Sequence, residues 1–241
     1  MSLAAMQPYL FPYLGYFQLM DCVDTYLFCE KLQYMKDGWV NRNRLLVKSG
    51  DNVPHFFSFV VQKDDYKKNI DQRYYRSLRT DCKRLEHTLC LHYNKAVNFE
   101  EAYSVIEEIL RFEDENVAAF NINANRRLAQ YLGIQARFLQ VGDIQDETFQ
   151  RTFADAERVE RVIYFCHYLK ETHFVNAING QALYDKAYFA ENGIDLKFIQ
   201  MDDMEYPQQR TPFIPNLSII DVIMNNKRED VRKMLKRYRL V

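Results

Sequence analysis

One stretch near the N-terminus decides the fold: Met6-Gln-Pro-Tyr-Leu-Phe-Pro-Tyr-Leu-Gly-Tyr-Phe-Gln-Leu-Met20. The apolar residues 3–6 predict a short buried strand, and from Leu14 onward apolar residues recur at helical spacing. Pro8 and Pro12 lie between them, and because proline fixes φ and lacks an N–H, this segment should be an ordered loop. In such a turn the loop amides and the helix N-terminus point toward the same place, which is a common ligand site in α/β proteins. An ordinary strand-to-helix connection, with packing tyrosines, explains the stretch equally well.

Length and composition predict one domain over residues 1–241. The chain has 241 residues, 48% of them hydrophobic, which is enough for a large core and a helical subdomain at about 63–133. Its 32 basic and 33 acidic residues argue against nucleic-acid binding through bulk charge. Five scattered cysteines without a C-x-x-C pair argue against a disulfide framework and favour a cytoplasmic location. No stretch approaches the ~20 apolar residues of a membrane span.

Alternating strand and helix patterns predict a mostly parallel sheet flanked by helices, with a β-hairpin near the N-terminus and a helical insertion at about 63–133. The hairpin is expected to turn at the Ser49-Gly50-Asp51-Asn52 cluster. In the insertion, a helix should begin after Asn116 as N-cap and end at Gly133. The predicted sheet strands are 3–6, 25–29, 136–141, 173–178 and 194–199. The predicted later helices are 153–169, 182–191, one from 218, and a basic one at 226–239.

The segment Trp39-x-Asn41-Arg42-Asn43-Arg44 is the sharpest polar signal. Alternation in an extended segment directs the two asparagines one way and the two arginines the other. Two guanidiniums on one face are suited to a phosphate or pyrophosphate, and two amides with an indole are suited to a sugar. A solvated hairpin edge is the alternative, but the single tryptophan beside these residues favours a function.

Further candidates follow from position in the predicted elements. Asn176, Asn179 and Gly180 lie toward the carboxyl end of the predicted strand 173–178, where α/β sheets bind ligands, although a structural turn explains them equally well. Asp221 lies in the first turn of the helix that Ser218 caps, where the helix dipole favours a carboxylate whatever its function. If it faces a cleft, it is a candidate general base.

No metal site is predicted. Only some of Cys82, His87, Cys90 and His92 can converge on one side of a helix, and Cys82 falls on the predicted apolar face.

In these residues the chain resembles the WbqC-like family over essentially its whole length. The matching motifs are Met6-Gln7-Pro8-x-x-x-Pro12-x-x-Gly15-Tyr16-Phe17, Trp39-x-Asn41-Arg42-Asn43-Arg44, Tyr93-x-Lys95-Ala96, Asn121, Tyr131-Leu-Gly-Ile134, Thr172-His-x-x-Asn176-x-Ile-x-Gly180, Leu183-Tyr184, Asn192-Gly-Ile194 and Phe213-x-Pro215-x-Leu-Ser218-Ile-x-Asp221. The resemblance implies a role in O-antigen or other surface-polysaccharide synthesis, with transfer of glycine or a related acyl group to a sugar. Glu30-Lys31 stands where many relatives carry two acidic residues, so no paired-carboxylate or metal role is carried over there.

The working hypothesis is a transferase without a bound cofactor, acting on a nucleotide-linked sugar and an activated acyl donor. Arg42 and Arg44 would hold the pyrophosphate. The other substrate-binding candidates stack on a sugar or base, bond hydroxyls or line the turn: Tyr9, Pro12, Gly15, Tyr16, Trp39, Asn41, Asn43, Asn176, Asn179 and Gly180. The catalytic candidates are Asp221 as base and Gln7, with the amides of the Gln7–Gly15 loop as oxyanion donors.

Two other functions remain open. One is an ATP-using ligase or nucleotidylyl-type enzyme, since Tyr13-Leu-Gly-Tyr16 is similar in placement to the H-x-G-H turn of nucleotidylyltransferases. Tyrosines replace both histidines, which argues against nucleotidyl transfer itself. The other is a non-catalytic subunit that binds sugar nucleotides. A homo-oligomer is compatible with the sequence.

Overall fold

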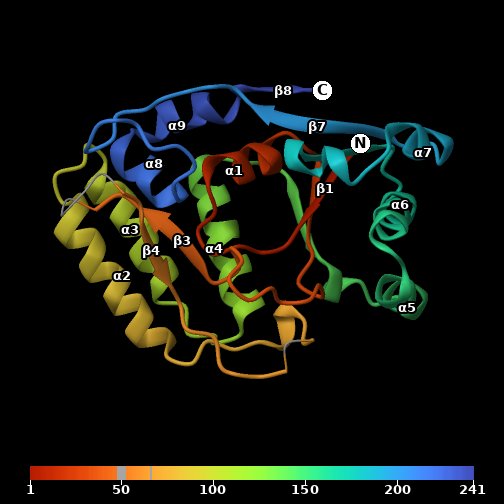
Figure 1. The fold of residues 1–241 in the computed structure, drawn as a ribbon, viewed down its shortest axis with the longest axis horizontal. Coiled ribbons are helices and arrows are strands. Elements are labelled where there is room, and N and C mark those ends of the chain that lie inside the picture. The colour runs from red at the N-terminus through yellow and green to blue at the C-terminus, as the bar shows by residue number, and fades with distance from the viewer. Residues whose placement is uncertain (48–52, 66) are drawn as a thin grey trace.

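The computed structural model describes residues 1–47, 53–65 and 67–241 (Figure 1). Its main sheet has the strand order β5-β2-β1-β6-β7-β8, and every neighbouring pair is parallel except β7 with β8. The predicted fold class, a mostly parallel sheet with flanking helices, is therefore confirmed. The strands are β1 (Ser2–Met6), β2 (Thr25–Phe28), β5 (Arg137–Gln140), β6 (His173–Ala177), β7 (Asp195–Met201) and β8 (Tyr238–Leu240).

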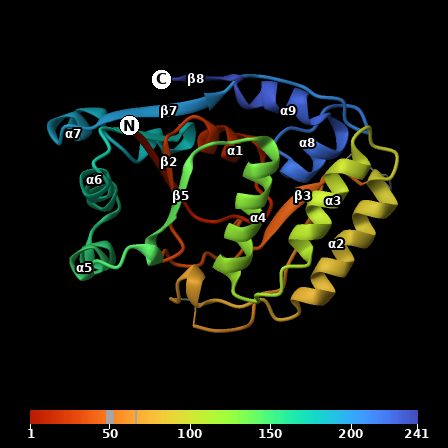
Figure 2. The ribbon, with the colours of Figure 1, turned by 180° about the vertical axis from the view of Figure 1, so that it is seen from behind.

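Side chains alternate across the sheet and bury two hydrophobic cores, one on each face. In β2, for example, Tyr26 and Phe28 enter one core and Leu27 enters the other. Helices α5, α6 and α7 cover the face of Leu27, and Figures 1 and 2 show α5 and α6 across the strands from α1 and α4. These three helices are α5 (Glu147–Asp155), α6 (Arg158–Leu169) and α7 (Lys186–Glu191). The core on the other face includes residues of α1 (Leu14–Asp21), α4 (Val117–Leu132), α8 (Ile219–Asn225) and α9 (Arg228–Leu235).

The predicted hairpin and helical insertion are present. Strands β3 (Arg42–Leu45) and β4 (His55–Ser58) pair antiparallel, while the expected turn at Ser49–Asn52 lies outside the described residues. In the insertion, α3 (Phe99–Leu110) lies between α2 (Leu78–Tyr93) and α4 (Figure 2). As predicted, the Asn116 side chain caps α4, and the helix ends at Gly133, whose φ is +79°.

Three predicted helices need correction. The helix expected at 153–169 is two, because the chain is extended at Ala156 and Glu157 between α5 and α6. The helix expected at 182–191 begins only at Lys186, after a 3₁₀ turn at Ile178–Ala182. The helix expected to end at Arg239 ends at Leu235, since Tyr238–Leu240 instead pairs with the edge of β7. Shorter 3₁₀ turns occur at Ile70–Gln72 and Val141–Asp143.

The chain leaves β1 and β6 toward opposite faces of the sheet. After β1 it forms α1 on one face, and after β6 it returns through α7 on the other. Numbered along the chain, the strands have the order 3-2-1-4-5-6 known from doubly wound nucleotide-binding sheets. Such sheets bind ligands at the carboxyl ends of the strands where the order reverses, and here that point lies between β1 and β6.

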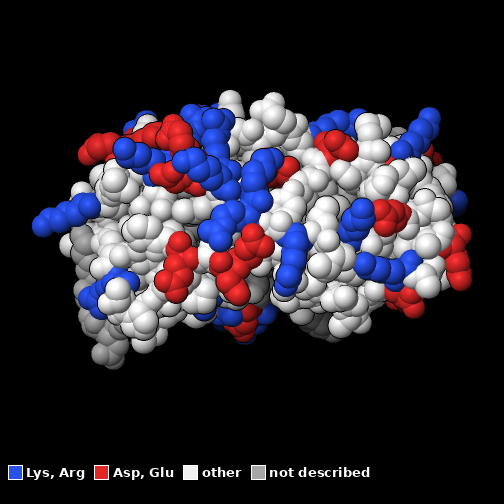
Figure 3. All heavy atoms as spheres, turned by 90° about the horizontal axis from the view of Figure 1, so that it is seen from above, with Lys and Arg blue, Asp and Glu red and all other residues white. Residues whose placement is uncertain are grey.

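The outer surface shows no strong separation of charge on the face that carries β7, β8 and α9. Figure 3 shows Lys and Arg side chains lying next to Asp and Glu there, so their fields partly cancel. Among the described residues, no helix combines the length and the apolar content needed to cross a membrane.

Candidate functional site

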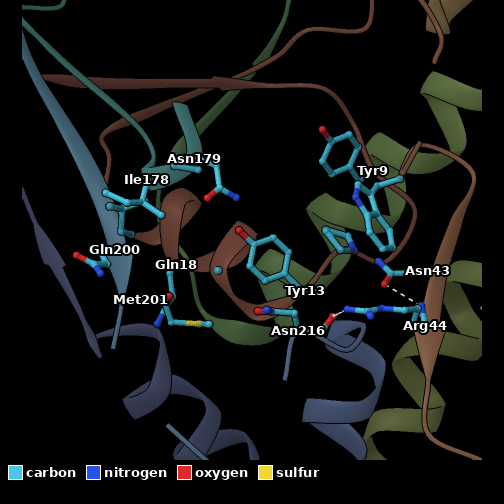
Figure 4. Close-up of a pocket in the computed structure, with 15 residues that line it drawn as sticks. Tyr9, Tyr13, Gln18, Asn43, Arg44, Ile178, Asn179, Gln200, Met201 and Asn216 are labelled. Carbon is cyan, nitrogen blue, oxygen red and sulfur yellow. Dashed lines mark hydrogen bonds between the residues drawn. The ribbon is translucent and has the colours of Figure 1, made fainter. Parts of the chain in front are cut away.

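A cavity of about 460 Å³ opens at the carboxyl edge of the sheet (Figure 4). Its walls come from the turn after β1, from the segment around β3, from the ends of β6 and β7, and from the loop before α8. The lining residues are Tyr9, Pro12, Tyr13, Gly15, Gln18, Trp39, Asn43, Arg44, Ala177, Ile178, Asn179, Ile199, Gln200, Met201 and Asn216. The cavity thus lies where the strand order reverses, and both the proline turn and Arg44 border it.

The turn after β1 is held through its carbonyl oxygens. Side chains of three asparagines and a serine, together with a backbone amide of α8, donate to consecutive carbonyls. The bonds are Asn121 Nδ2 to Pro8 (3.0 Å), Asn125 Nδ2 to Tyr9 (3.0 Å), Asn43 Nδ2 to Leu10 (3.3 Å) and Phe11 (2.8 Å), Ser218 Oγ to Phe11 (2.7 Å) and Ile219 N–H to Pro12 (2.8 Å). Three distant elements, β3, α4 and α8, therefore fix this loop.

This clamping supports an unfavourable backbone conformation at Phe11. Its φ is +44°, in the left-handed region that residues other than glycine rarely adopt. Such a conformation costs about 1–3 kcal/mol and persists only when the surroundings impose it. The turn is therefore rigid before any ligand binds.

The start of α1 faces the cavity without a capping side chain. Tyr13 is the N-cap residue, its side chain makes no capping bond, and the first turn carries no acidic residue. A Cβ at Gly15 would lie 2.5 Å from the Tyr13 ring, so only glycine lets that ring fold over the helix start. Burial raises the pKa of Tyr13 and keeps its hydroxyl neutral. Its hydroxyl points toward the Asn179 end of the cavity (Figure 4).

The two arginines of β3 share one face of the strand, as alternation predicted, but only Arg44 lines the cavity. Arg44 donates to the Asn216 carbonyl at 3.1 Å, and its guanidinium lies 5.5 Å from the centre of the Trp39 ring. Arg42 instead donates to the carbonyl of Asp37, with its Nη1 3.7 Å from that residue's carboxylate. The predicted pair of guanidiniums therefore does not meet in the cavity.

The asparagines of the same segment are structural. Asn41 accepts from the Tyr34 hydroxyl and donates to the Phe59 carbonyl. Asn43 borders the cavity, but its Nδ2 clamps the proline turn and its Oδ1 accepts the Arg44 backbone N–H at 2.8 Å. The sequence reading that gave both amides to sugar hydroxyls does not agree with these bonds.

Of the other predicted site residues, some line the cavity and some have structural contacts elsewhere. Asn179 lines the cavity, whereas Asn176 is buried and its Oδ1 accepts the N–H of the next residue. Gly180 packs so tightly on the Asn176 amide that a Cβ would lie 2.5 Å from Nδ2. Tyr16 is buried and donates to the Gln7 carbonyl, and the Gln7 side chain donates to the Gln33 carbonyl at 3.3 Å. Neither Tyr16 nor Gln7 is among the lining residues.

Asp221 is buried away from the lining. The Tyr93 hydroxyl donates to its Oδ1 at 2.6 Å, and the Tyr206 hydroxyl donates to its Oδ2 at 2.8 Å. Burial raises the pKa of the Asp221 carboxyl, although both tyrosines favour its charged form. The arrangement ties α8 to α2 and to the loop after β7, and it gives the carboxylate no contact with the cavity.

Several lining residues were missed by sequence reasoning. Gln18 follows Gly15 by three positions, which places it on the same side of α1. Its Nε2 donates to the carbonyls of Met234 and Arg237. Ala177, Ile178, Ile199, Gln200, Met201 and Asn216 come from strand ends and a loop. The carboxyl-end rule that singled out Asn179 also applies to Gln200 and Met201, at the end of the adjacent strand.

The lining combines aromatic, aliphatic and amide side chains with a single cation. None of its described residues is an Asp, Glu, His or Cys, so Arg44 and the tyrosines are its ionisable groups. Elsewhere among the described residues, no group of three or more such side chains is placed to hold a metal ion. Glu30 accepts from the backbone amides of Val141 and Gly142, which joins the ends of β2 and β5. Within the described lining, Arg44 is therefore the group that can pair with an anion.

Comparison with known proteins agrees with the motifs. The chain matches the WbqC-like protein family over residues 7–233. It is 25% identical over 229 residues to the uncharacterized protein Rv1507c of Mycobacterium tuberculosis (strain ATCC 25618 / H37Rv), and the match covers 93% of each chain. No solved structure matches significantly. Because the family match extends over nearly the whole chain, this protein belongs to the WbqC-like protein family.

Proposed function

We propose that the protein is a transferase of surface-polysaccharide synthesis that acylates an amino sugar carried on a nucleotide, with glycine or another small acyl group. Membership of the WbqC-like family supports the biological setting. The observation that carries the proposal is the order of chemical groups along the cavity. Arg44 stands at one end and Asn179 at the other, with Tyr13 between them (Figure 4).

This order corresponds to a sugar joined to a phosphate group. The guanidinium of Arg44 is a strong partner for phosphate oxygens, and the uncapped start of α1 at Gly15 favours an anion nearby. The amide of Asn179 suits sugar hydroxyls, while the ring of Tyr13 offers an apolar face. A mostly neutral wall with one cation fits a ligand whose charge is confined to its phosphates.

In the proposed reaction the sugar amine attacks the carbonyl carbon of the acyl donor. A carbon–nitrogen bond forms, the bond to the donor's leaving group breaks, and the leaving group departs with the electron pair. The neutral Tyr13 hydroxyl is a donor for the oxyanion that develops on the carbonyl. Because no carboxylate or imidazole lies among the described lining residues, the amine proton passes to the leaving group or to water.

The first test compares the two arginines of β3. Arg44→Ala should weaken binding of a nucleotide sugar such as UDP-N-acetylglucosamine by about 10- to 150-fold, since a hydrogen bond to a charged group contributes roughly 1.5–3 kcal/mol. Arg42→Ala is the matched control when the ligand is inorganic pyrophosphate, because it removes the same charge from the same strand face outside the lining and this ligand carries no base. Isothermal titration calorimetry measures the affinity of both variants for pyrophosphate, and that of Arg44→Ala for a panel of nucleotide sugars.

An equal loss of affinity in the two variants would indicate a general effect of charge and would contradict the phosphate assignment.

Product formation is tested separately, by mass spectrometry of amino-sugar nucleotides incubated with the protein and with glycyl-tRNA, a glycyl adenylate or an acyl thioester. Binding without any product across these donors contradicts the transferase.

Two specific observations favour other functions. The lack of a carboxylate, imidazole or thiol among the described lining residues suits a non-catalytic subunit that binds sugar nucleotides. The strand order 3-2-1-4-5-6 suits an ATP-using ligase or nucleotidylyl-type enzyme. Product formation that requires ATP and magnesium would favour the second of these.

A further inference from the structure

An aromatic surface adjoins the Arg44 end of the cavity. The rings of Trp39 and Phe56 have their centres 6.2 Å apart and their planes within 25° of each other. We call this pair the Trp39–Phe56 shelf. The separation exceeds the ~3.5–4 Å of direct carbon contact, so the rings are offset and neither fully covers the other.

Both rings rest on guanidiniums of β3. Arg42 lies 5.0 Å from the centre of the Phe56 ring, and Arg44 lies 5.5 Å from the centre of the Trp39 ring. The hairpin register explains this, because Arg44 pairs with Phe56 and alternation places Arg42 on the same face. The opposite face of β3 carries Asn43 and Leu45, which are buried.

The shelf remains open to solvent although it is held in place. Trp39 is 41% exposed and Phe56 is 57% exposed, whereas Phe59, directly after β4, is only 1% exposed. Two ordered, exposed rings with cations beside them form a platform on which a planar ring can stack.

We propose that the Trp39–Phe56 shelf binds the nucleobase of the nucleotide sugar. This inference rests on the proposed function and adds the orientation of the ligand to it. The base stacks on the shelf, the diphosphate lies at Arg44 and the start of α1, and the sugar reaches the Asn179 end.

The order of the groups distinguishes the base from the sugar as occupant of the shelf. Phe56 lies outside the cavity lining, while Trp39 and Arg44 border it, so the shelf extends outward from the phosphate end. In a nucleotide sugar the diphosphate separates the base from the sugar. Because the Asn179 amide lies at the end of the cavity away from Arg44 and the aromatic rings adjoin the Arg44 end, the base is the part that falls on the shelf. Arg42 then supports the shelf and does not contact phosphate.

The experiment uses the fact that Trp39 is the single tryptophan of the chain, so its fluorescence reports on the shelf and on the adjoining Arg44 end of the cavity. Uridine or guanosine diphosphate, which stacks on the ring, should quench this fluorescence in the full-length protein more strongly than saturating inorganic pyrophosphate does. Phe56→Ala should weaken nucleoside diphosphate binding by about 5- to 150-fold, the range found for loss of one base–aromatic stack, and leave pyrophosphate binding unchanged. Phe56→Tyr should restore affinity. Leu91→Ala is the control, since Leu91 is 56% exposed on α2.

The outcomes separate the two proposals. If Arg44→Ala weakens nucleoside diphosphate binding and Phe56→Ala does not, the shelf assignment is wrong and the proposed function stands. An equal effect of Phe56→Ala on pyrophosphate also overturns the shelf assignment, because the ring would then act only through the arginines. If a saturating nucleoside diphosphate does not quench the fluorescence of Trp39, the shelf assignment is also wrong. A protein that binds neither nucleotides nor nucleotide sugars overturns both proposals.

Discussion

Asp221 shows how a residue with a catalytic profile in the sequence becomes a structural one in the fold. Its carboxylate is fully buried and receives the hydroxyls of Tyr93 and Tyr206. Tyr93 also accepts the Leu46 backbone N–H at 3.1 Å, so the carboxylate belongs to a buried network that joins four segments. Networks of this kind stabilise a fold when every member is satisfied.

We predict that Asp221 makes stability depend on pH. Burial raises its pKa above the ordinary value of 3.8, so the folded protein holds the proton more tightly than the unfolded chain does. The stabilisation from this proton is complete below the unfolded pKa and is lost as pH rises through the raised folded pKa. The free energy of unfolding of the wild type, relative to Asp221→Asn, should therefore fall as pH rises from about 3.5 and then become constant. Urea denaturation of both proteins across that range measures the difference.

Asp221→Asn serves as the control for the wild type, because the asparagine does not ionise and all other groups titrate equally in the two proteins. A stability difference that rises with pH would mean that the tyrosine hydrogen bonds lower the pKa of Asp221 by more than burial raises it.

Sequence position alone could not have shown the structural role of Asp221. The helix start at Ser218 was evident and the carboxylate at its first turn is favoured there, but the Tyr93 partner is 128 residues away.

The arginines of β3 give the same lesson for the site. Alternation correctly predicted that Arg42 and Arg44 share a face. Which of them reaches the cavity depends on local partners, because Asp37 engages Arg42 while Arg44 meets the Asn216 carbonyl, 172 residues away in the chain. Residue type and spacing therefore identified the segment but could not select the side chain.

At the scale of elements, the start of α1 is the most constrained part of the site. The proline turn is clamped by β3, α4 and α8, and Tyr13 folds over the first turn of the helix. The position of the Tyr13 ring depends on Gly15, since a Cβ there would overlap the ring at 2.5 Å. The shape of the cavity beside Tyr13 therefore depends on the absence of a side chain at Gly15.

We predict that Gly15→Ala reduces ligand affinity and leaves the fold intact. The alanine methyl would displace the Tyr13 ring into the cavity, because Gly15 and Tyr13 both line it. Helix propensity favours alanine by about 1 kcal/mol, which offsets part of the crowding. Circular dichroism and thermal unfolding should therefore change little, while calorimetry should show at least about tenfold weaker binding of a nucleotide sugar. In a Tyr13→Ala background the overlapping ring is absent, so adding Gly15→Ala should cause little further loss of affinity. Unchanged affinity in the single variant would place the ligand away from the helix start.

Elements with a regular apolar pattern were predicted well, and those set by edge pairing or local caps were not. The strands 3–6 and 25–29 and the helix closed by Gly133 follow from periodicity and capping. The basic C-terminal segment resembles a helix throughout, yet Tyr238–Leu240 becomes a strand because β7 offers an unpaired edge. The break between α5 and α6 has no proline or glycine to signal it.

On the scale of the whole molecule, the cavity joins parts of the chain that are far apart in sequence. The turn after β1, the hairpin, the ends of β6 and β7, and Asn216 meet only because the chain leaves β1 and β6 toward opposite faces of the sheet. A ligand seated there contacts all of these segments at once. Because it binds only the folded state, it should stabilise that state by about 2.7 kcal/mol at a concentration of 100 times Kd.

This geometry predicts a pattern of hydrogen exchange that no single-segment site would produce. A saturating nucleotide sugar should slow amide exchange together in residues 9–18, 39–44, 177–179 and 199–201, which border the cavity. Exchange in α5 and α6 should not change, because these helices pack on the opposite face of the sheet, and they serve as the internal control (Figure 1). Hydrogen–deuterium exchange with mass spectrometry measures both groups of peptides. Protection limited to the hairpin would indicate a surface site at β3 and β4 alone, whereas joint protection requires a ligand that spans the point where the strand order reverses.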